Sequence, residues 1–314
     1  MKPAQRVGAL LMALIAVGCT AIAVRRLSDW RSSFPTSELF VFYRPSGIEL
    51  SRNGVSLYFP DEKTASFCRA IELNDQQAVE WNLSSGINVN YVGKHGLTPL
   101  LWAFLHRRDD FYIELLRHGA NPDHTTTGDV TYLSRSIIAG DSFLIAAAKQ
   151  MQLSAVIDAV PFSQNLNHRD ASGSGFLPPY IFHTSFRDEE SPSEVLRKDF
   201  DQMVKNGLDV NMRHERGSTA LHISFKYNTV FAILLLEHGA DPMIANDAGM
   251  RAIDRFYQTA EYNPTPKSLT TIFKLMQEQG YIDRHLTLIE AIKEQSPTWI
   301  PRQDLETISH LQSS

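Results

Sequence analysis

A five-residue cue recurs along the chain at an almost constant interval. It reads Gly-Leu-Asp-Val-Asn at 207–211 and Gly-Ala-Asp-Pro-Met at 239–243, so these copies begin 32 positions apart. Related copies begin at Gly86 and Gly119, which are 33 positions apart. A period of this length indicates an array in which each unit buries its hydrophobic face against the next one. The sequence therefore predicts a solenoid over much of its length.

A second motif follows the cue within each unit. It reads Gly-Leu-Thr-Pro-Leu-Leu-Trp-Ala at 96–103 and Gly-Ser-Thr-Ala-Leu-His at 217–222. The proline suits the first turn of a helix, where its missing N–H would have no partner in any case. Helical sequence then continues to the next cue, at 111–117 and at 230–237. Each unit is therefore predicted to be two helices joined by a turn.

The period and the two motifs resemble the ankyrin repeat, whose first helix opens with Thr-Pro-Leu-His. The resemblance covers 66–283 and implies an all-α ankyrin-repeat solenoid of about six helix-turn-helix repeats. It also implies that Thr219 and His222 hydrogen-bond locally to stabilise their turn. Because a solenoid must cover its last hydrophobic face, the amphipathic sequence in 284–314 is expected to form a C-terminal cap.

The repeat pattern is irregular at 128–206. Gly207 follows Gly119 by 88 positions. Two repeats of the usual period of about 33 residues would take about 66 of these positions, so about 22 residues are additional. Residues 128–133 occupy the slot of the second motif without its proline, and they are followed by 134–139 and a helix at 142–149. The extra residues are expected in longer helices or in protruding loops, and 185–192 is one candidate loop.

The N-terminus carries an uncharged apolar run, 7–24, with basic residues on both sides. In one interpretation, Ala-Val-Gly-Cys at 16–19 is a lipoprotein signal and Cys19 bears the lipid of a mature bacterial protein. In the other, the run is an uncleaved anchor, just long enough to cross a hydrocarbon core of about 30 Å. Both interpretations make 1–26 an address that holds the body at a bacterial envelope membrane, with the body in the periplasm.

Residues 27–65 do not follow the repeat. The runs 37–43 and 55–59 are rich in β-forming residues and each is followed by a proline, while Asn53-Gly54 is a turn signal. We expect a tether with a small β-hairpin here, and an extended linker is the alternative.

Composition and motifs argue against several classes of function. The net charge of −5 provides no basic field that would attract nucleic acid. The two cysteines, Cys19 and Cys68, are too few for a disulfide framework, and Cys68 is expected to be a small buried residue. No metal-binding spacing, phosphate loop or catalytic nucleophile motif is present in the sequence. We therefore expect neither an enzyme nor a bound cofactor or metal.

In the family that the chain resembles, finger loops and first helices line the side that binds a partner. The resemblance places Tyr91, Lys94, His95, Thr125 to Thr127, His168, Arg169, Arg213, His214 and Asn246 on finger loops. It places Trp102, His106, Tyr132, Arg135 and Lys226 on exposed first-helix positions. Trp, Tyr and Arg are enriched at binding hot spots, so these residues are the candidate partner-binding set.

An envelope address together with this array resembles a group of bacterial ankyrin proteins. Some of these are immunity proteins beside type VI secretion toxins, among them lipases that act in the periplasm. The resemblance implies a protein partner of this kind, a phospholipase being one candidate. A structural or regulatory envelope scaffold that recruits a membrane protein is the alternative, and a secreted effector is a third class that a retained anchor disfavours.

Overall fold

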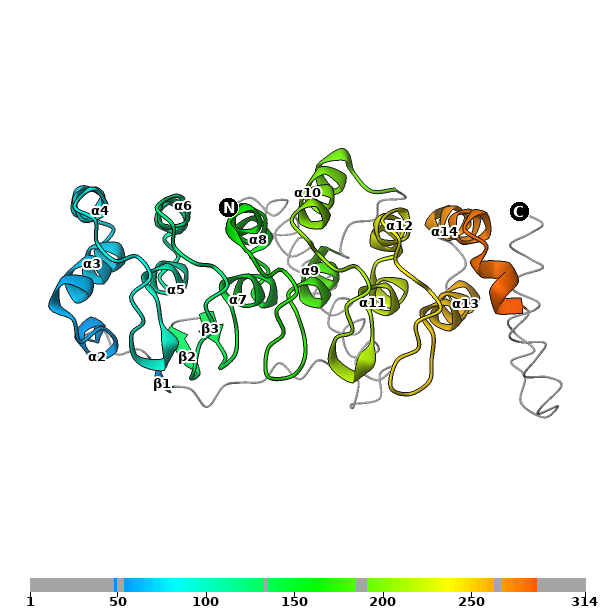
Figure 1. Cartoon of the computed structure of the whole chain (residues 1–314), viewed down its shortest axis with the longest axis horizontal. Coiled ribbons are helices and arrows are strands. Elements are labelled where there is room, and N and C mark those ends of the chain that lie inside the picture. The colour runs from blue at the N-terminus through cyan, green and yellow to red at the C-terminus, as the bar shows by residue number, and fades with distance from the viewer. Residues whose placement is uncertain (1–47, 50–53, 133–134, 185–190, 263–266, 287–314) are drawn as a thin grey trace, which may run out of the picture. The chain divides into compact units, whose positions relative to one another are not determined.

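The structure is a computed structural model, and it describes residues 48–49, 54–132, 135–184, 191–262 and 267–286. All of these lie in the larger of the two compact units of the chain, residues 45–314. Figure 1 shows the helices of this unit as successive pairs. The first helices of the pairs lie in one row, the second helices lie in another, and the finger loops extend from the row of first helices.

Six helix pairs follow one another along the described chain. In chain order they are α3 (Glu62–Leu73) with α4 (Gln76–Ser84), α5 (Pro99–Leu105) with α6 (Asp109–Arg117), α7 (Phe143–Lys149) with α8 (Leu153–Ala159), α9 (Leu177–Thr184) with α10 (Glu194–Lys205), α11 (Ala220–Tyr227) with α12 (Thr229–Glu237), and α13 (Ala252–Tyr262) with α14 (Lys267–Glu278). The all-α solenoid of about six repeats is therefore confirmed.

The first helices of the two regular repeats, α5 and α11, begin where the sequence motif supplies a cap. The Thr98 hydroxyl accepts the N–H of Leu101 (3.3 Å), and Pro99 occupies the first helical turn. In the fifth pair, Thr219 and His222 form a reciprocal capping box, with the Thr219 N–H donating to His222 Nδ1 (3.2 Å). The other ring nitrogen of His222 lies 2.9 Å from the carbonyl oxygen of Met250, in the next finger. The local role predicted for this pair is confirmed.

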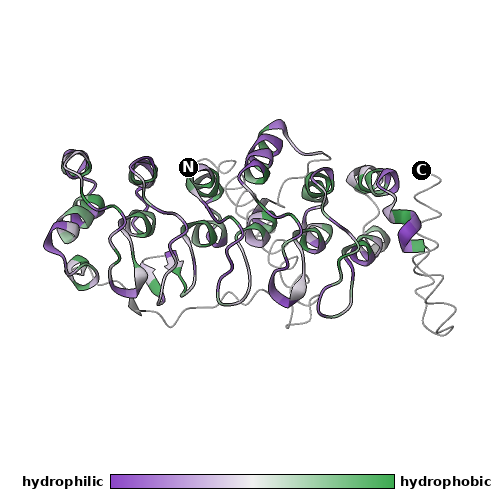
Figure 2. Ribbon diagram, viewed as in Figure 1, coloured by the Kyte–Doolittle hydropathy of each residue, from purple (hydrophilic) through white to green (hydrophobic). Residues whose placement is uncertain are grey.

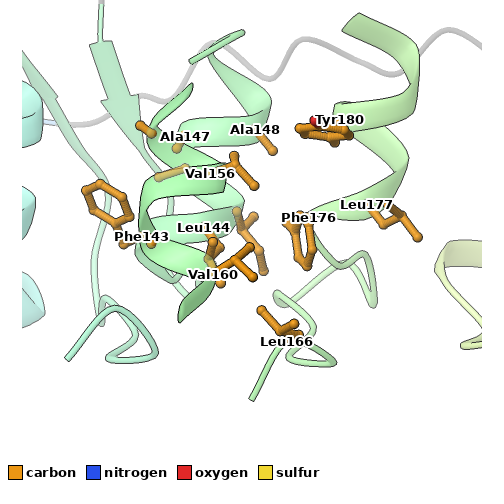
Figure 3. Close-up of a cluster of buried hydrophobic side chains, with 14 of the residues drawn as sticks. Phe143, Leu144, Ala147, Ala148, Val156, Val160, Leu166, Phe176, Leu177 and Tyr180 are labelled. Atoms are coloured by element: carbon orange, nitrogen blue, oxygen red, sulfur yellow. The ribbon is translucent and has the colours of Figure 1, made fainter. Parts of the chain in front are cut away.

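The core runs continuously between the two rows of helices. Neighbouring first helices pack on one another, as α9 does on α11 and α11 on α13, while α6 packs on α8 and α12 on α14 in the second row. In Figure 2 the ribbon is coloured hydrophobic mainly where helices face each other and hydrophilic mainly on their outer sides. Figure 3 shows how one section is filled, and its labelled residues are Phe143, Leu144, Ala147, Ala148, Val156, Val160, Leu166, Phe176, Leu177 and Tyr180.

The last residue of the cue joins neighbouring repeats. Asn90 Nδ2 donates to the carbonyl oxygen of Gly119 (2.8 Å), and its Oδ1 accepts the N–H of Asn121 (2.7 Å). Asn211 makes the same two bonds to Gly239 (3.1 Å) and Asp241 (2.7 Å). We call each such pair of bonds a rung. Because a rung satisfies backbone groups at the end of the next repeat, it sets the spacing between consecutive repeats.

The same rung position is filled by different chemistry in the middle of the array. Asn167 bonds to Gly207 and Asp209 in the regular way, at 2.8 Å each. At the preceding interface a carboxylate takes the place of the amide. Asp123 accepts from the N–H groups of Gln164 (2.6 Å) and Asn165 (3.2 Å) and from the Ser163 hydroxyl (2.5 Å).

The irregular middle contains an insertion in one finger. In a regular repeat, the N-cap of the next first helix follows the cue glycine by twelve positions, as Thr219 follows Gly207. In the irregular middle, Ser142 follows Gly119 by twenty-three positions. The additional residues form a hairpin of β2 (Val130–Tyr132) and β3 (Arg135–Ile137), which pair antiparallel. Residues 135–139 thus belong to the enlarged finger and do not lead directly into a helix. β1 (Ile48–Glu49) pairs in parallel with β2, so the sheet order is β1-β2-β3.

The remaining extra residues lie between α9 and α10 and within α10. This junction includes the candidate loop 185–192, of which 185–190 lie outside the described residues. α10 is longer than the other second helices of the central repeats, and Figure 1 shows it standing out from their row. Its buried side packs on α12 through Phe200 and Phe231, whose ring centroids lie 5.1 Å apart.

The segment before the first repeat differs from the expectation. The run 55–59 was predicted to be a strand, but α2 (Val55–Tyr58) is a helix. Tertiary contact overrides β propensity here, because α2 closes over the first finger. A side chain at Gly93 would meet the carbonyl oxygen of Tyr58 at 2.4 Å, so this close approach requires glycine. The other predicted run, 37–43, lies outside the described residues.

Both termini of the chain lie outside the described residues. A helix occupies 281–286 after α14, but most of the predicted cap, 287–314, is not described. The apolar run 7–24 and Cys19 are also outside. Among the helices of the described residues, none combines the length and the apolar character that crossing a membrane requires.

Candidate partner-binding surface

Trp102, predicted to be exposed on a first helix, is part of the core. It is 2% exposed, and its Nε1 donates to the carbonyl oxygen of Cys68 (3.0 Å). Tyr58 and Phe59 cover it, with ring centroids 5.8 and 5.4 Å away. The prediction of exposure was wrong because these two aromatic residues were assigned to a strand, and the helix that covers Trp102 was not foreseen.

His106 lies between Trp102 and the inserted hairpin. Its ring centroid is 4.5 Å from that of Trp102 and 4.1 Å from that of Tyr132, so three rings form a continuous series. Its exposure of 9% is lower than predicted. Burial, with the nearby charge of Arg108, lowers the pKa of His106 to about 4, so the imidazole is neutral at pH 7. Its Nε2 makes no hydrogen bond.

The hairpin carries the next two predicted residues, which are therefore not on a first helix. Tyr132 is half-buried at the end of β2. Arg135, on β3, is 5% exposed, so its predicted exposure was wrong. It is held below the hairpin, where Nη1 donates to the carbonyl oxygen of Phe104 and the guanidinium lies 4.4 Å from the Phe104 ring centroid. Arg135 anchors the hairpin, and Tyr132 is the residue that the hairpin presents.

The first finger approaches the same place. Lys94 is exposed at its tip, while His95 and Tyr91 are half-buried. His95 has a left-handed backbone (φ +60°), and its carbonyl oxygen accepts the N–H of Thr127 (2.9 Å) at the start of the insertion. A side chain at Gly128 would meet His95 Nδ1 at 2.4 Å, so finger and insertion are in close contact. We call Tyr91, Lys94, His95, His106 and Tyr132 the hairpin patch.

The remaining predicted residues lie further along the fingers. Arg169 and Arg213 are exposed, and Arg213 donates to the carbonyl oxygen of Ala245 (2.8 Å) and pairs with Asp247 (3.5 Å). Lys226 is half-buried, with its Nζ 5.1 Å from the ring centroid of Tyr227. These residues do not join the hairpin patch.

Two predicted finger residues serve the frame instead. His214 is 6% exposed, contrary to the prediction, and its Nδ1 accepts the N–H of Gly175 (3.2 Å). Burial, with the charge of Arg169, lowers the pKa of His214 to about 4. His168 is half-buried, with Nε2 3.0 Å from the carbonyl oxygen of Gly140. Of the other finger positions, Thr126 is buried, Thr127 is exposed, and Thr125 and Asn246 are half-buried.

Several aromatic contacts were not found from the sequence. Phe182 on α9 and Tyr227 on α11 lie 5.2 Å apart between ring centroids, both half-buried on neighbouring first helices. The signal that could have found them is their shared position near the end of each first helix. Tyr58 and Phe59 were missed because α2 was not recognised.

The reactive side chains of the described residues are engaged in the frame. Lys149 Nζ lies 2.7 Å from both Asp141 and Asp170, whose side chains are 1% and 5% exposed. Cys68 is buried, and burial raises the pKa of its thiol well above the usual value. Within the described ranges, no three metal-ligating side chains converge. The arrangement of the described residues offers a contact surface.

Comparison with known proteins agrees with the architecture. The sequence matches no family model and no curated protein. An ankyrin repeat domain from Acinetobacter baumannii is similar in structure, with a TM-score of 0.50 and 20% identity, over 68% of this chain and 97% of that one. The ankyrin repeat protein EF0377 has a TM-score of 0.48 and 20% identity, over 68% and 97%. A third similar chain comes from the complex of the predatory endopeptidase Bd0816 of Bdellovibrio bacteriovorus with the immunity protein Bd3460. Its TM-score is 0.47 and its sequence identity is 19%, and the match covers 66% of this chain and 97% of that one.

The described body is thus a helical repeat solenoid. More specifically, it has the ankyrin-repeat fold.

Proposed function

We propose that this chain is a non-catalytic protein-binding module of the bacterial envelope, and that it is an immunity protein that neutralises a secreted toxin. The observation that carries the binding role is the hairpin patch. It combines three half-buried aromatic or imidazole rings with an exposed lysine, where the first finger meets a finger enlarged by insertion. Insertions in a solenoid often carry its function.

The frame beneath the patch suits tight binding. The rungs and the buried core hold successive fingers in register, and Arg135 fixes the hairpin from below. A surface that is already ordered loses little conformational entropy when it binds a partner, so more of the contact energy appears as affinity. This favours an inhibitor that must hold its target without turnover.

The envelope and toxin parts of the proposal rest on the sequence. The run 7–24 with Cys19 supports a tether at the membrane, and the resemblance to bacterial immunity proteins supports a toxin as partner. A periplasm-acting lipase is the candidate target. The chain would act by covering the active site or the membrane-contacting face of that enzyme.

Binding is tested with the product of the toxin-like gene adjacent to this one, mixed with the full-length chain in mild detergent and measured by calorimetry. Tyr132→Ala is expected to weaken binding by about 10- to 100-fold, as for a hot-spot residue. Trp81→Ala is the matched control, because Trp81 is 68% exposed on α4, in the second row of helices. If Trp81→Ala lost binding and Tyr132→Ala did not, the interface would lie on the second row of helices and not on the hairpin patch.

The biological role has its own test. Cells that lack this chain should be killed by the toxin, and wild-type chain should restore resistance while Tyr132→Ala restores less. Full resistance without the chain would overturn the immunity proposal. Cys19→Ser separates the two tethers, because it abolishes labelling by a palmitate analogue only if Cys19 is lipidated.

A further inference from the structure

His285 is enclosed at the C-terminal end of the array. It lies in the helix at 281–286, which follows the turn at Gly280, and its side chain is 0% exposed. Its ring stacks on that of Tyr257 in α13, with centroids 5.1 Å apart and planes 24° from parallel. Neither ring nitrogen makes a hydrogen bond. The imidazole therefore sits here as an apolar ring, although it can accept a proton.

The charged groups that face this ring are already committed. From α13, the Asp254 carboxylate comes within 3.9 Å of Nδ1. Arg251, just before α13, donates to Asp254 from Nε (3.1 Å), Nη2 (2.9 Å) and its backbone N–H (2.8 Å). On the segment itself, Arg284 is exposed, with its guanidinium 5.5 Å from the Tyr281 ring centroid. Asp283 is also exposed.

This environment favours the neutral imidazole of His285 over the protonated one. A proton on His285 would place a positive charge in a buried site, where the nearest carboxylate, Asp254, is already paired with Arg251. Burial is the main cause that lowers the pKa of His285 to about 4, the positive charge of Arg251 adds to this effect, and Asp254 opposes it. In the undocked segment the ring is in water and titrates near the ordinary value of 6.5.

We propose that the helix at 281–286 is an acid-released latch, docked on α13 while His285 is neutral and freed when His285 takes up a proton. Release removes Ile282, which is 2% exposed, together with His285 from the end of the core. It also uncovers Tyr257. A hydrophobic face at the end of the solenoid then becomes available in acid but not at neutral pH.

The size of the effect follows from proton linkage. Because the docked form binds protons more weakly than the undocked form, the docked form is favoured above the undocked value of 6.5 and loses stability as the pH falls towards 4. The undocking equilibrium constant is expected to rise about 30-fold between pH 8 and pH 5. Most of this rise lies below pH 6.5.

The test is hydrogen–deuterium exchange of the full-length chain in mild detergent between pH 8 and pH 4.5, corrected for intrinsic exchange rates. Peptides that cover 281–286 should lose protection about 30-fold by pH 5, whereas α11 should not. His285→Phe keeps a stacked ring that cannot be charged, so it should remain protected at pH 5. His118→Phe, at an exposed histidine after α6, is the control and should behave as wild type.

Two results would overturn the latch. One is wild-type protection of 281–286 that does not change with pH, and the other is an equal loss in wild type and His285→Phe. If His285→Phe does not fold, the pKa of the His285 imidazole is measured in the wild-type chain by NMR, and this pKa decides whether the latch exists. A value near 4 supports the latch, and a value near 6.5 with the segment still protected excludes it.

Discussion

The regular repeats and the irregular middle solve the same stacking problem with different residues. Between Gly86 and Gly119, and again between Gly207 and Gly239, the unit keeps its period, its threonine cap and its asparagine rung. Between Gly119 and Gly207 a serine replaces the threonine, a carboxylate replaces one amide, and a hairpin enlarges a finger. The comparison teaches that what persists is the hydrogen-bonded position. The residue that fills that position varies.

The largest effect on the unfolding free energy is expected at one position of the first helix, which the two regions fill with side chains of very different size. Trp102 follows the cap by four positions, and Ala146 occupies the equivalent slot of the irregular repeat. Trp102→Ala should cost about 3–5 kcal/mol of unfolding free energy, because Tyr58 and Phe59 would line the cavity. Denaturant titration measures this. A cost below about 1 kcal/mol would mean that α2 does not pack on the first repeat.

The buried ion cluster is the corresponding weak point of the irregular region. Lys149→Met leaves the carboxylates of Asp141 and Asp170 buried without their cation, and should cost about 3 kcal/mol. Adding Asp141→Asn and Asp170→Asn should restore much of this loss. No recovery in the triple variant would show that Lys149 acts through packing alone.

Acid should weaken both regions through buried neutral histidines. The pKa of His106 is about 4 in the folded chain and 6.5 in the unfolded chain. Its contribution to the free energy of unfolding is therefore complete above pH 6.5 and is lost as the pH falls towards 4. Between pH 7 and pH 5 the loss is about 2 kcal/mol. His106→Phe should reduce the pH dependence by that amount in denaturant titrations at the two pH values. His214→Gln should do the same at the contact where His214 accepts the N–H of Gly175, in the irregular region.

The rungs allow a direct comparison of amide and carboxylate. Asn211→Ala removes two bonds between repeats and should cost about 1–2 kcal/mol. Asp123→Ala should cost about as much if the carboxylate rung is equivalent. Asn206→Ala is the control, because its side chain bonds only within its own repeat, to Gln202. A large effect of the control would show that helix ends, and not rungs, limit stability.

The smallest effects on stability are expected at the finger tips of the two regions. Lys94→Ala and Arg169→Ala should each change the unfolding free energy by less than about 0.5 kcal/mol, because both side chains are exposed. Thermal unfolding checks this. If either variant weakens binding of the candidate toxin while stability is unchanged, that finger belongs to the interface.

Local signals were sufficient for most of the frame. The helix predicted at 230–237 is Thr229–Glu237, and the one predicted at 142–149 is Phe143–Lys149, because side-chain caps and the hydrophobic period mark these ends directly. The run 55–59 failed because its β-forming residues are held in a helix by contacts with the first finger. The inserted hairpin was missed because 128–133 was aligned to the motif slot that Ser142 occupies.

The contact surface was less predictable than the frame. The predicted exposure was correct for Lys94, Arg169 and Arg213. It was wrong for Trp102, His106, Arg135 and His214, because each contacts an element that departs from the repeat or a neighbouring finger. Burial at these positions depends on neighbours distant in sequence. Whether the candidate partner-binding set binds a partner stays a prediction.

The series of rungs ends one interface early. At the position where Asn90, Asp123, Asn167 and Asn211 bridge to the following unit, the fifth repeat has Met243, whose thioether cannot donate and accepts only weakly. In a linear array each unit is held only by its neighbours, and this joint relies on other bonds, such as the one from Gln279 Nε2 to the carbonyl oxygen of Leu236 (3.1 Å). Under a force applied at the C-terminal end, the sixth pair should therefore peel away before the pairs that a rung holds, and unravelling should travel towards the N-terminal repeats.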